Sequence, residues 1–488
     1  MFGYRTILTE APRPAAVRGH PWAPWLAVTV VCFGAFMGQL DASIVTLTFR
    51  PMERDFGAPL AAVQWVSLGY LLVLVALLTP AGRIADAIGR KLVYGYGFAV
   101  FTVGSAACAF APTLGLLVAC RVLQAVGAAM LQANSVGLVA TSAPAGRMRL
   151  GLSIQAAAQA IGLGLGPTLG GLLTQTAGWR AVYWINVPVG CIAIVAGRYL
   201  LPRTTERRQD ASFDWPGAAL LGTASVTLLV ALSIIGGLQA PGWLGALMAA
   251  IAVAAGAAFA IRQRHAWHPL IPHEFVRSAR IKLGLAGALL GYLVLFGPLV
   301  LVPQLLAGHS SVVRTGLIVS ALPAGFGVAA LTAEAVLPRG LRNRTRGSIG
   351  AAACAAVMTM LIFMSSSTIG IVLLLGLAGL SLGVLVPANN ALIMRTGAAS
   401  SAGTLGGLVN MARGIGTTLG IALVTLALHI GGSAGTSHHP DGTLAFALLA
   451  AAAACAAVIT MTIQPLRGAP NRMASVDAAA PEATSAFG

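Results

Sequence analysis

Long apolar segments, repeated from one end of the chain to the other, constrain the fold more than any other feature of this sequence. Windows of about 19 to 25 apolar residues alternate with short connections that contain glycine, proline and charged residues. Each window is long enough to cross a bilayer as an α-helix, which satisfies its own backbone hydrogen bonds there. The predicted spans lie near residues 24–49, 59–80, 92–111, 113–142, 150–175, 180–201, 215–235, 242–262, 281–306, 313–337, 347–366, 367–391, 402–430 and 442–464. We therefore predict an all-α integral membrane protein with fourteen transmembrane helices.

The composition agrees with a membrane protein and argues against a nucleic-acid-binding protein. Only 9% of the 488 residues are charged, against about 25% in soluble proteins. The formal net charge is +17, but a nucleic-acid-binding protein would need a basic face or domain. Here the basic residues are scattered in short clusters between apolar segments. We therefore expect a lipid bilayer as the surroundings and no nucleic-acid partner.

The distribution of the basic residues predicts the orientation of the chain. Most of the 30 Lys and Arg residues fall in every second connection, as the excess of positive charge in cytoplasmic loops requires. The other connections hold only Arg50, Arg54, Arg180 and Arg314. Residues 1–23 and 465–488 are then cytoplasmic tails, the second one disordered, in a protein of the bacterial inner membrane. The first apolar segment has no cleavage signature and is expected to remain as a span.

An internal repeat predicts two homologous halves. Residues 126–135 align with 382–391, and residues 160–170 align with 414–424, at nearly equal offsets. The repeat predicts a six-helix bundle at 24–201, a second at 281–464, and an inserted helix pair at 215–262. Two such halves are typical of a transporter whose site lies at mid-membrane on their interface.

Neither metal nor cofactor chemistry is indicated. The six cysteines lie within apolar segments and form no C-x-x-C pair, so disulfides and a zinc site are not expected. His265, His268 and His273 share one connection but lack the spacing and the acids of a metal site. No G-x-x-x-x-G-K-[ST] sequence is present, which argues against a self-contained ATP-driven pump.

Two opposite charges are predicted at one depth in the membrane. Asp41 and Arg121 each lie about eight residues from the outer end of their span, which is about 12 Å at 1.5 Å per residue. A carboxylate and a guanidinium buried at equal depth relieve each other's burial. The pair is either a static contact between helices or a proton-coupling site whose carboxylate titrates, and we favour the second.

Several motifs resemble those of the major facilitator superfamily. GRIADAIGRK at residues 82–91 is similar to its loop signature G-x-L-A-D-R-x-G-R-K, with Ala87 in place of the first arginine. The resemblance implies a gate between the halves, in which a carboxylate caps a helix N-terminus across the interface and latches the outward-open state. The residues of this latch are Gly82, Asp86, Gly89, Arg90 and Lys91. We expect them in the loop between the second and third spans.

Other segments resemble the fourteen-helix drug:proton antiporters within that superfamily. LDASIVTLTFRP (40–51) and WRAVYWINVPVG (179–190) are similar to segments of this group. RVLQAVG (121–127) resembles the R-x-x-Q-G-x-G motif of the superfamily as a whole, with Ala125 where glycine is usual. GLGLGPTLGG (162–171) is similar to the exporter motif G-x-x-x-G-P-x-x-G-G. Pro167 of this motif can bend the helix, and its glycines permit the backbone of a neighbouring helix to approach closely. The motif then indicates either an exporter or only general packing of helices through glycine. The glycines are Gly162, Gly166, Gly170 and Gly171.

Three polar residues are candidates for lining a cargo site, namely Gln124, Asn410 and Arg413. Arg413 would bind an anionic group of the cargo or pair with a backbone carbonyl. Glu334, near Arg339 and Arg342, is predicted to reach toward the membrane interface rather than to form a second proton site.

The sequence thus predicts a proton-coupled secondary transporter with the major facilitator fold, which exports small, mostly hydrophobic compounds or drugs by alternating access. Its partners would be the cargo and protons, and we expect a monomer. The alternatives are an exporter of an endogenous metabolite on the same fold, a membrane-embedded enzyme, or a channel. The last two are disfavoured because no cluster of catalytic groups and no ring of charges is evident.

Overall fold

A computed structural model describes residues 10, 12–205, 213–235, 240–306, 312–338, 340–364, 367–434 and 442–463, and in these ranges it contains helices and no strands. The first group of helices is α2 (Ala15–Arg18), α3 (Ala23–Ile44), η1 (Val45–Thr48), α4 (Phe49–Phe56), α5 (Leu60–Val63), α6 (Trp65–Ile88), α7 (Arg90–Phe110), α8 (Leu114–Ser142), α9 (Met148–Ala177), α10 (Ala181–Trp184) and α11 (Asn186–Leu200). Two further helices follow, α12 (Trp215–Ile235) and α13 (Gly242–His265). The last group is α14 (His273–Arg277), α15 (Ala279–Leu305), α16 (Val312–Val336), α17 (Asn343–Met364), α18 (Thr368–Met394), η2 (Ala399–Ser401), α19 (Ala402–Ala434) and α20 (Thr443–Thr462).

The prediction of fourteen spans is confirmed when a bent helix is counted as one span. Thirteen helices in the described residues are long and apolar enough to cross a membrane. The fourteenth is α9, whose segments Met148–Gly166 and Thr168–Ala177 meet at an angle of 43°. Pro167 separates the two segments, and a proline inside a helix removes a backbone hydrogen bond and bends the helix.

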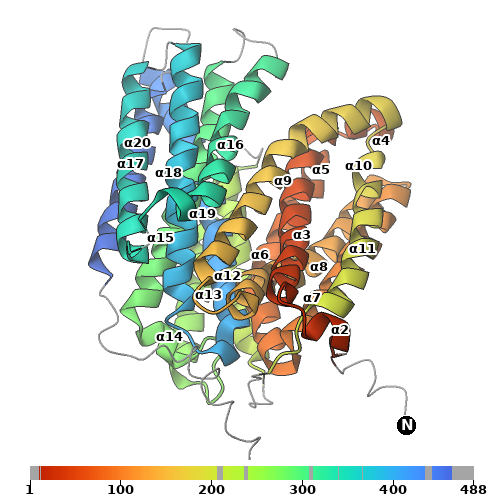
Figure 1. Cartoon of the computed structure of the whole chain (residues 1–488). Helices are drawn as coiled ribbons and strands as arrows, with labels where there is room; N and C mark the ends of the chain where they lie inside the picture. Colours follow the sequence, from red (N-terminus) through yellow and green to blue (C-terminus); the bar gives the residue numbers. More distant parts are fainter. Residues whose placement is uncertain are drawn as a thin grey trace, which may run out of the picture.

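The helices form two groups that meet at one end of the molecule. In Figure 1, α3 and α6–α11 lie on the right, α15–α20 lie on the left, and the groups diverge toward the top. Helices α6 and α8 contact α19, and α9 contacts α16 and α18. Helix α12 packs against its partner α13 and against both α6 and α19. This arrangement accommodates the expected two bundles and inserted pair, which stay a prediction.

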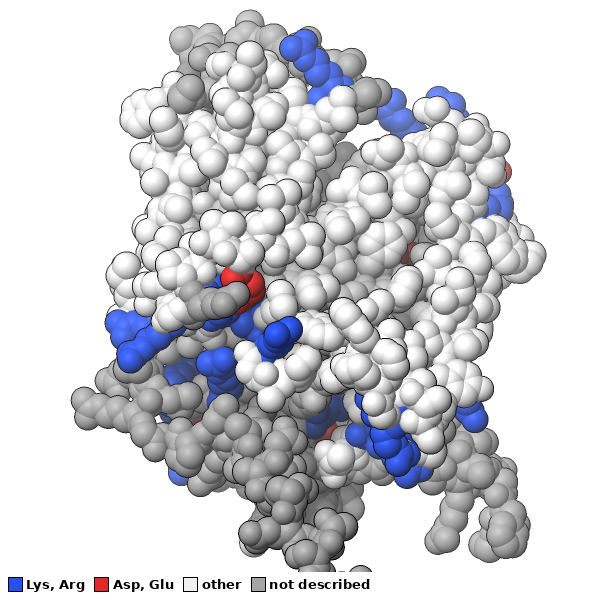
Figure 2. Space-filling model, in the orientation of Figure 1, with Lys and Arg blue, Asp and Glu red and all other residues white. Residues whose placement is uncertain are grey.

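Positive charge gathers over the lower part of the molecule in this view (Figure 2). We call this the basic end, defined by Arg83, Arg90, Lys91, Arg147, Arg149, Arg342, Arg344, Arg346 and Arg395. The other end carries α4 and α10, which lie at the top of Figure 1.

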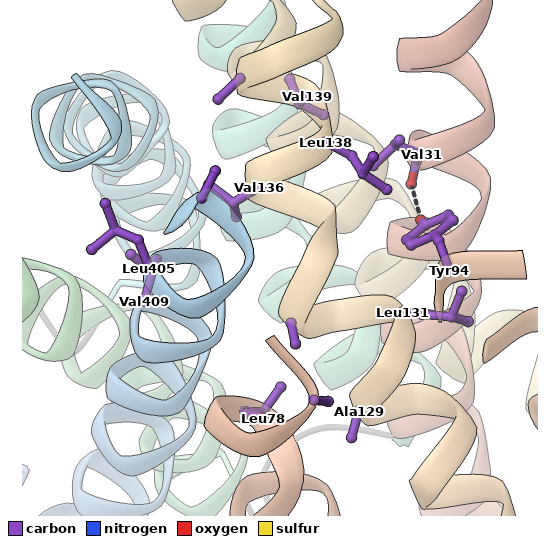
Figure 3. Close-up of a cluster of buried hydrophobic side chains, with 14 of the residues drawn as sticks. Val31, Leu78, Tyr94, Ala129, Leu131, Val136, Leu138, Val139, Leu405 and Val409 are labelled. Atoms are coloured by element: carbon purple, nitrogen blue, oxygen red, sulfur yellow. Dashed lines mark hydrogen bonds between the residues drawn. The ribbon is translucent and has the colours of Figure 1, made fainter. Parts of the chain in front are cut away.

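A buried apolar cluster joins early and late helices near the basic end. Figure 3 shows Leu405 and Val409 of α19 close to Val136 of α8. On the far side of the cluster, the Tyr94 hydroxyl donates to the carbonyl oxygen of Val31 at 3.0 Å. Packing of α19 against α8 therefore continues the apolar core of the first group of helices.

The segment 82–91 is helical, which corrects the expectation of a loop. Helix α6 continues to Ile88 and α7 begins at Arg90, so Gly89 is the only residue between them. Gly89 has φ 122°, a backbone conformation that favours glycine. The expectation was wrong because charged residues end a membrane span without ending the helix that carries it.

Part of the predicted N-terminal tail packs against the body of the protein. The carboxylate of Glu10, of which 3% is exposed, accepts hydrogen bonds from the backbone N–H and the hydroxyl of Thr204 at 2.7 and 2.9 Å. These contacts join the start of the chain to the segment that follows α11.

Candidate functional site

Asp41 lies at the centre of a buried polar network in the first group of helices. It is 0% exposed, and its Oδ2 accepts a hydrogen bond from Arg121 Nη1 at 2.7 Å. Its Oδ1 accepts from Gln124 Nε2 at 3.0 Å and from Asn186 Nδ2 at 3.1 Å. The two charges predicted at one depth therefore lie in contact, and three side chains donate hydrogen bonds to the carboxylate.

Arg121 connects this network to α6. Its Nε donates to the carbonyl oxygen of Val66 at 3.1 Å, and its Nη1 also donates to Gln124 Oε1 at 2.7 Å. Its guanidinium carbon lies 4.1 Å from the ring centre of Tyr70 and 5.7 Å from that of Tyr183. Cations over aromatic rings are stabilised in dry surroundings, so Arg121 is held on several sides at once.

The network also contains residues that sequence reasoning assigned elsewhere or missed. Gln124, predicted to line a cargo site, is 0% exposed and bonds to Asp41 instead. Asn186 was not predicted. It is an uncharged polar residue in segment 179–190, and its position near the outer end of its predicted span could have suggested that it lies at the depth of Asp41. Its Nδ2 also donates to the Ser105 hydroxyl at 3.1 Å.

The glycine motif of α9 packs against α3, the helix that carries Asp41. A Cβ atom at Gly162 would lie 2.6 Å from the carbonyl oxygen of Phe36, and one at Gly170 would lie 2.9 Å from that of Ile44. A Cβ at Gly166 would overlap Ser43. Gly171 has open space around it. Three of the four glycines thus permit close contact beside Asp41.

At the basic end, Asp86 caps the N-terminus of α19. Its Oδ1 accepts from the backbone N–H of Gly403 at 2.8 Å, and its Oδ2 accepts from the N–H and the hydroxyl of Thr404, both at 2.7 Å. The carboxylate is 0% exposed. An anion at this position satisfies orphan N–H groups and faces the positive end of the helix dipole.

The other predicted latch residues surround this contact. Arg90 donates to Asp86 Oδ1 at 3.2 Å and to the carbonyl oxygen of Ala399 in η2. A Cβ atom at Gly82 would overlap the carbonyl oxygen of Gly403, so α6 and α19 touch backbone to backbone. Gly89 forms the turn between helices, and Lys91 is buried at the start of α7.

A second polar cluster lies between the two groups of helices. Arg413 Nη1 donates to Asn410 Oδ1 at 3.0 Å, and its guanidinium carbon lies 4.9 Å from the ring centre of Tyr292. The Tyr292 hydroxyl donates to Gln159 Oε1 of α9 at 3.3 Å. Arg413 is 5% exposed, and its Nε has no hydrogen-bond partner. The described contacts of Arg413 are thus to side chains rather than to a backbone carbonyl.

Glu334 pairs across the groups of helices, which corrects its predicted surroundings. Its Oε2 accepts from Arg149 Nη2 of α9 at 2.8 Å, and its Oε1 accepts from Arg346 Nη1 at 3.4 Å. Arg342 is not in the pair, and Arg339 lies outside the described residues. Hydropathy places Glu334 near the membrane surface but does not reveal that α9 is its neighbour.

The described residues bring buried charged and polar groups together around Asp41 and around Arg413. In the described part of the chain, no three His, Cys, Asp or Glu residues form a group that could hold a metal. The six cysteines are free. The fold and its buried charges thus define a polytopic membrane protein of the transporter class.

The chain belongs to the Major Facilitator Superfamily, whose sequence pattern it matches over residues 31–421, and it is a transporter rather than an enzyme. It is 37% identical over 282 residues to the tetracenomycin C resistance and export protein of Streptomyces glaucescens, an alignment that covers 56% of this chain and 51% of that protein. It is 29% identical over 412 residues to a methylenomycin A resistance protein of Streptomyces coelicolor, with 82% and 85% covered. A riboflavin transporter of Clostridioides difficile, RibZ, is 34% identical over 209 residues, with 43% and 46% covered. The chain thus spans about half the length of the first and the third of these relatives.

Solved structures confirm the fold. The human organic anion transporter MFSD10 superposes with a TM-score of 0.62 at 16% identity, covering 90% of this chain and 99% of that one. The proton:xylose symporter XylE superposes with a TM-score of 0.64 at 12% identity, with 93% and 98% covered. At these identities the likeness supports the fold alone.

Proposed function

We propose that the protein is a proton-coupled exporter of small, mostly hydrophobic compounds that works by alternating access. The observation that carries the proposal is Asp41, a fully buried carboxylate held by Arg121, Gln124 and Asn186. Ionisable groups this deep in a membrane protein are expensive and mark ion or proton pathways.

The geometry supports a protonation that depends on conformation. In this structure Arg121, Gln124 and Asn186 all donate hydrogen bonds to the Asp41 carboxylate. A conformation that withdraws Arg121 would leave Asp41 buried without its counter-charge and would favour the protonated form. Because Arg121 also bonds to Val66 of α6, a displacement of α6 would change the pair. Proton binding and helix movement are then coupled.

The state described is outward-open in this proposal, with the basic end in the cytoplasm and both chain termini on that side. The excess of Arg and Lys at this end supports the orientation, since cytoplasmic connections carry such an excess. Contacts between α6, α8 and α19 close this end, and Asp86 caps α19 there. Cargo would leave from the opposite end, where the two groups of helices diverge (Figure 1).

The cargo site of the proposal is the cluster around Arg413. Its guanidinium faces Tyr292 and retains an unpartnered Nε, so it suits a cargo with an anionic or carbonyl oxygen. Relatives named for resistance to tetracenomycin C and methylenomycin A support export of drugs. A relative named as a riboflavin transporter supports the second candidate, export of a metabolite on the same fold.

Asp41→Asn tests the proton role. The change keeps the size of the side chain and removes its charge, so we expect drug efflux driven by a pH gradient in proteoliposomes to fall to background while expression persists. Asp55→Asn removes an exposed carboxylate at the same end and serves as the matched control. Unchanged transport by Asp41→Asn would reject the proton role.

The double variant separates proton coupling from static pairing. Arg121→Ala alone should cripple transport, since it leaves a buried carboxylate without its partner. If Arg121→Ala combined with Asp41→Asn restores transport, the pair is structural. A susceptibility panel in an efflux-deficient host, with riboflavin secretion measured in parallel, distinguishes drug export from metabolite export.

A further inference from the structure

A strongly basic cavity lies at the basic end, away from the Asp41 network and from the Arg413 cluster. Its volume is about 1420 Å³, and it opens between the start of α9 and the ends of α16, α17, α18 and α20. Six arginines and one acid line it. They are Arg147, Arg149, Arg280, Arg342, Arg344, Arg395 and Glu334.

The single acid in the lining is already engaged. Glu334 is paired with Arg149 and Arg346, so it cannot neutralise the other arginines. Among the described residues, no carboxylate forms a salt bridge with four of the lining arginines, namely Arg147, Arg342, Arg344 and Arg395. Burial, and then the positive charge of Arg149, lower the pKa of Arg395, as expected where positive charge gathers without compensation.

Asn343 supplies a second, independent observation. Its side chain is 5% exposed and lines the cavity. Its Oδ1 accepts a hydrogen bond from Arg149 Nη1 at 2.8 Å, but its Nδ2 is buried with no hydrogen-bond partner. A buried donor normally has a partner. This amide therefore points to an acceptor that occupies the cavity together with the arginines.

The rim of the cavity includes apolar side chains on membrane-spanning helices. Leu331 of α16, Ile349 of α17 and Met461 of α20 are 50%, 50% and 49% exposed. Exposed apolar residues on such spans face lipid, so hydrocarbon and the arginines lie side by side. Figure 2 shows the charged lower part of the molecule directly below a surface that carries few charged residues.

We propose that this cavity binds a phosphate group, supplied by the headgroup of an anionic phospholipid of the adjacent leaflet. Guanidinium groups match phosphate oxygens in geometry and charge, and basic pockets between spans on the cytoplasmic side suit such headgroups. The Asn343 amide donates to the same phosphate, and the acyl chains lie along Leu331 and Ile349. The proposal does not depend on what the protein exports.

The bound phosphate also joins the two groups of helices. Arg147 precedes α9 in the first group, whereas Arg342, Arg344 and Arg395 belong to the second. A phosphate held between them stabilises the closed basic end in the same sense as the Asp86 cap. Anionic lipid therefore favours the conformation described here over one in which this end is open.

The test measures binding of dioleoylphosphatidylglycerol to the full-length protein by native mass spectrometry from detergent. We expect saturable binding to the wild-type protein and binding weaker by at least tenfold in Arg342→Gln/Arg344→Gln. Each arginine contributes a charge-assisted contact that is typically worth tenfold or more. Arg147→Gln, on the other side of the cavity, should weaken binding independently if the double variant does not fold.

The matched control is Arg264→Gln/Arg277→Gln, which removes two exposed arginines outside the cavity. It should bind like the wild type, whereas equal weakening in the control would mean general attraction by net charge and would overturn the proposal. Wild-type affinity in both cavity variants would also overturn it. So would equal binding of dioleoylphosphatidylcholine, whose headgroup carries no net charge.

Two soluble probes distinguish the source of the phosphate. Glycerol 3-phosphate and inorganic phosphate are titrated against the bound lipid. If neither displaces it at millimolar concentration, the lipid is the ligand. Displacement that is lost in the same arginine variants supports the phosphate site but assigns it to a soluble phosphate compound.

Discussion

The cap that Asp86 places on α19 predicts how strongly one carboxylate holds the basic end closed. In Asp86→Asn, one oxygen remains as an acceptor and the other is replaced by an amide group that faces an N–H donor. The cap then loses at least one charge-assisted hydrogen bond, worth about 1.5–3 kcal/mol, and the charge at the helix N-terminus, worth about 1 kcal/mol. The total is about 3 kcal/mol, or about 100-fold in the equilibrium between closed and open conformations.

Part of this loss is offset, because burying an amide costs less than burying a carboxylate. We therefore expect a shift of about tenfold to 100-fold toward the open basic end. Ser401 reports this shift, since it is 6% exposed and lies directly before α19. In a background without the six native cysteines, which are all free, Ser401→Cys should react faster with a maleimide when Asp86→Asn is present.

The control is Asp55→Asn, which makes the same chemical change at the opposite end and should leave labelling of Ser401→Cys unchanged. A labelling rate in Asp86→Asn within twofold of the parent would refute the reasoning. So would an equal increase in the control, which would indicate general loosening of the fold.

Three further predictions concern packing, cargo and pH. Gly82→Ala should raise labelling of Ser401→Cys because the new methyl group would overlap the carbonyl oxygen of Gly403, while Gly171→Ala, with open space around it, should have no effect. Arg413→Gln should reduce efflux of an anionic fluorescent compound at least tenfold, whereas Arg413→Lys should retain part of the efflux. An equal loss of efflux for a neutral compound would contradict a role of Arg413 in recognising charge. Hydrogen bonds from Arg180, first, and from Trp179 lower the pKa of Asp55 below its ordinary value of 3.8. The ionised carboxylate therefore stabilises the folded protein above pH 3.8. This stabilisation is lost as the pH falls through the lower pKa of the folded state. Asp55→Asn should therefore unfold at a lower temperature than wild type at pH 7 but at nearly the same temperature at strongly acid pH, and a gap that does not change with pH would argue against the pair.

Depth in the membrane could be predicted from the sequence, whereas lateral neighbours could not. A helix rises by a fixed distance per residue, so counting from the end of a span placed Asp41 and Arg121 at one level. Their opposite charges then indicated the contact that the structure contains. Asn186 lies at the same site, but its side chain is uncharged, so no oppositely charged partner could be inferred for it from the sequence.

Glu334 illustrates the same limit. The nearest basic residues along the chain suggested its partners, but folding brings Arg149 to it from 185 positions away. Which helices adjoin around a bundle depends on the packing of whole faces, and the sequence of one span contains little of that information. The helical course of 82–91 was missed for a different reason, because hydropathy marks the edge of the membrane and not the end of a helix.

Beside its apolar cluster, the interface at the basic end contains several close contacts between backbones. Besides Gly82 and Gly403, a Cβ atom at Gly137, Gly406 or Gly407 would press against a carbonyl oxygen of the facing helix. Glycine has no side-chain rotamers to immobilise, so bringing these surfaces together sacrifices little side-chain entropy and separating them recovers little. Opening and closing then require no repacking of interlocked side chains at these positions. The free-energy difference between an open and a closed basic end then comes from the other contacts there, namely the apolar cluster around Leu405 and Val409 and polar contacts such as the Asp86 cap.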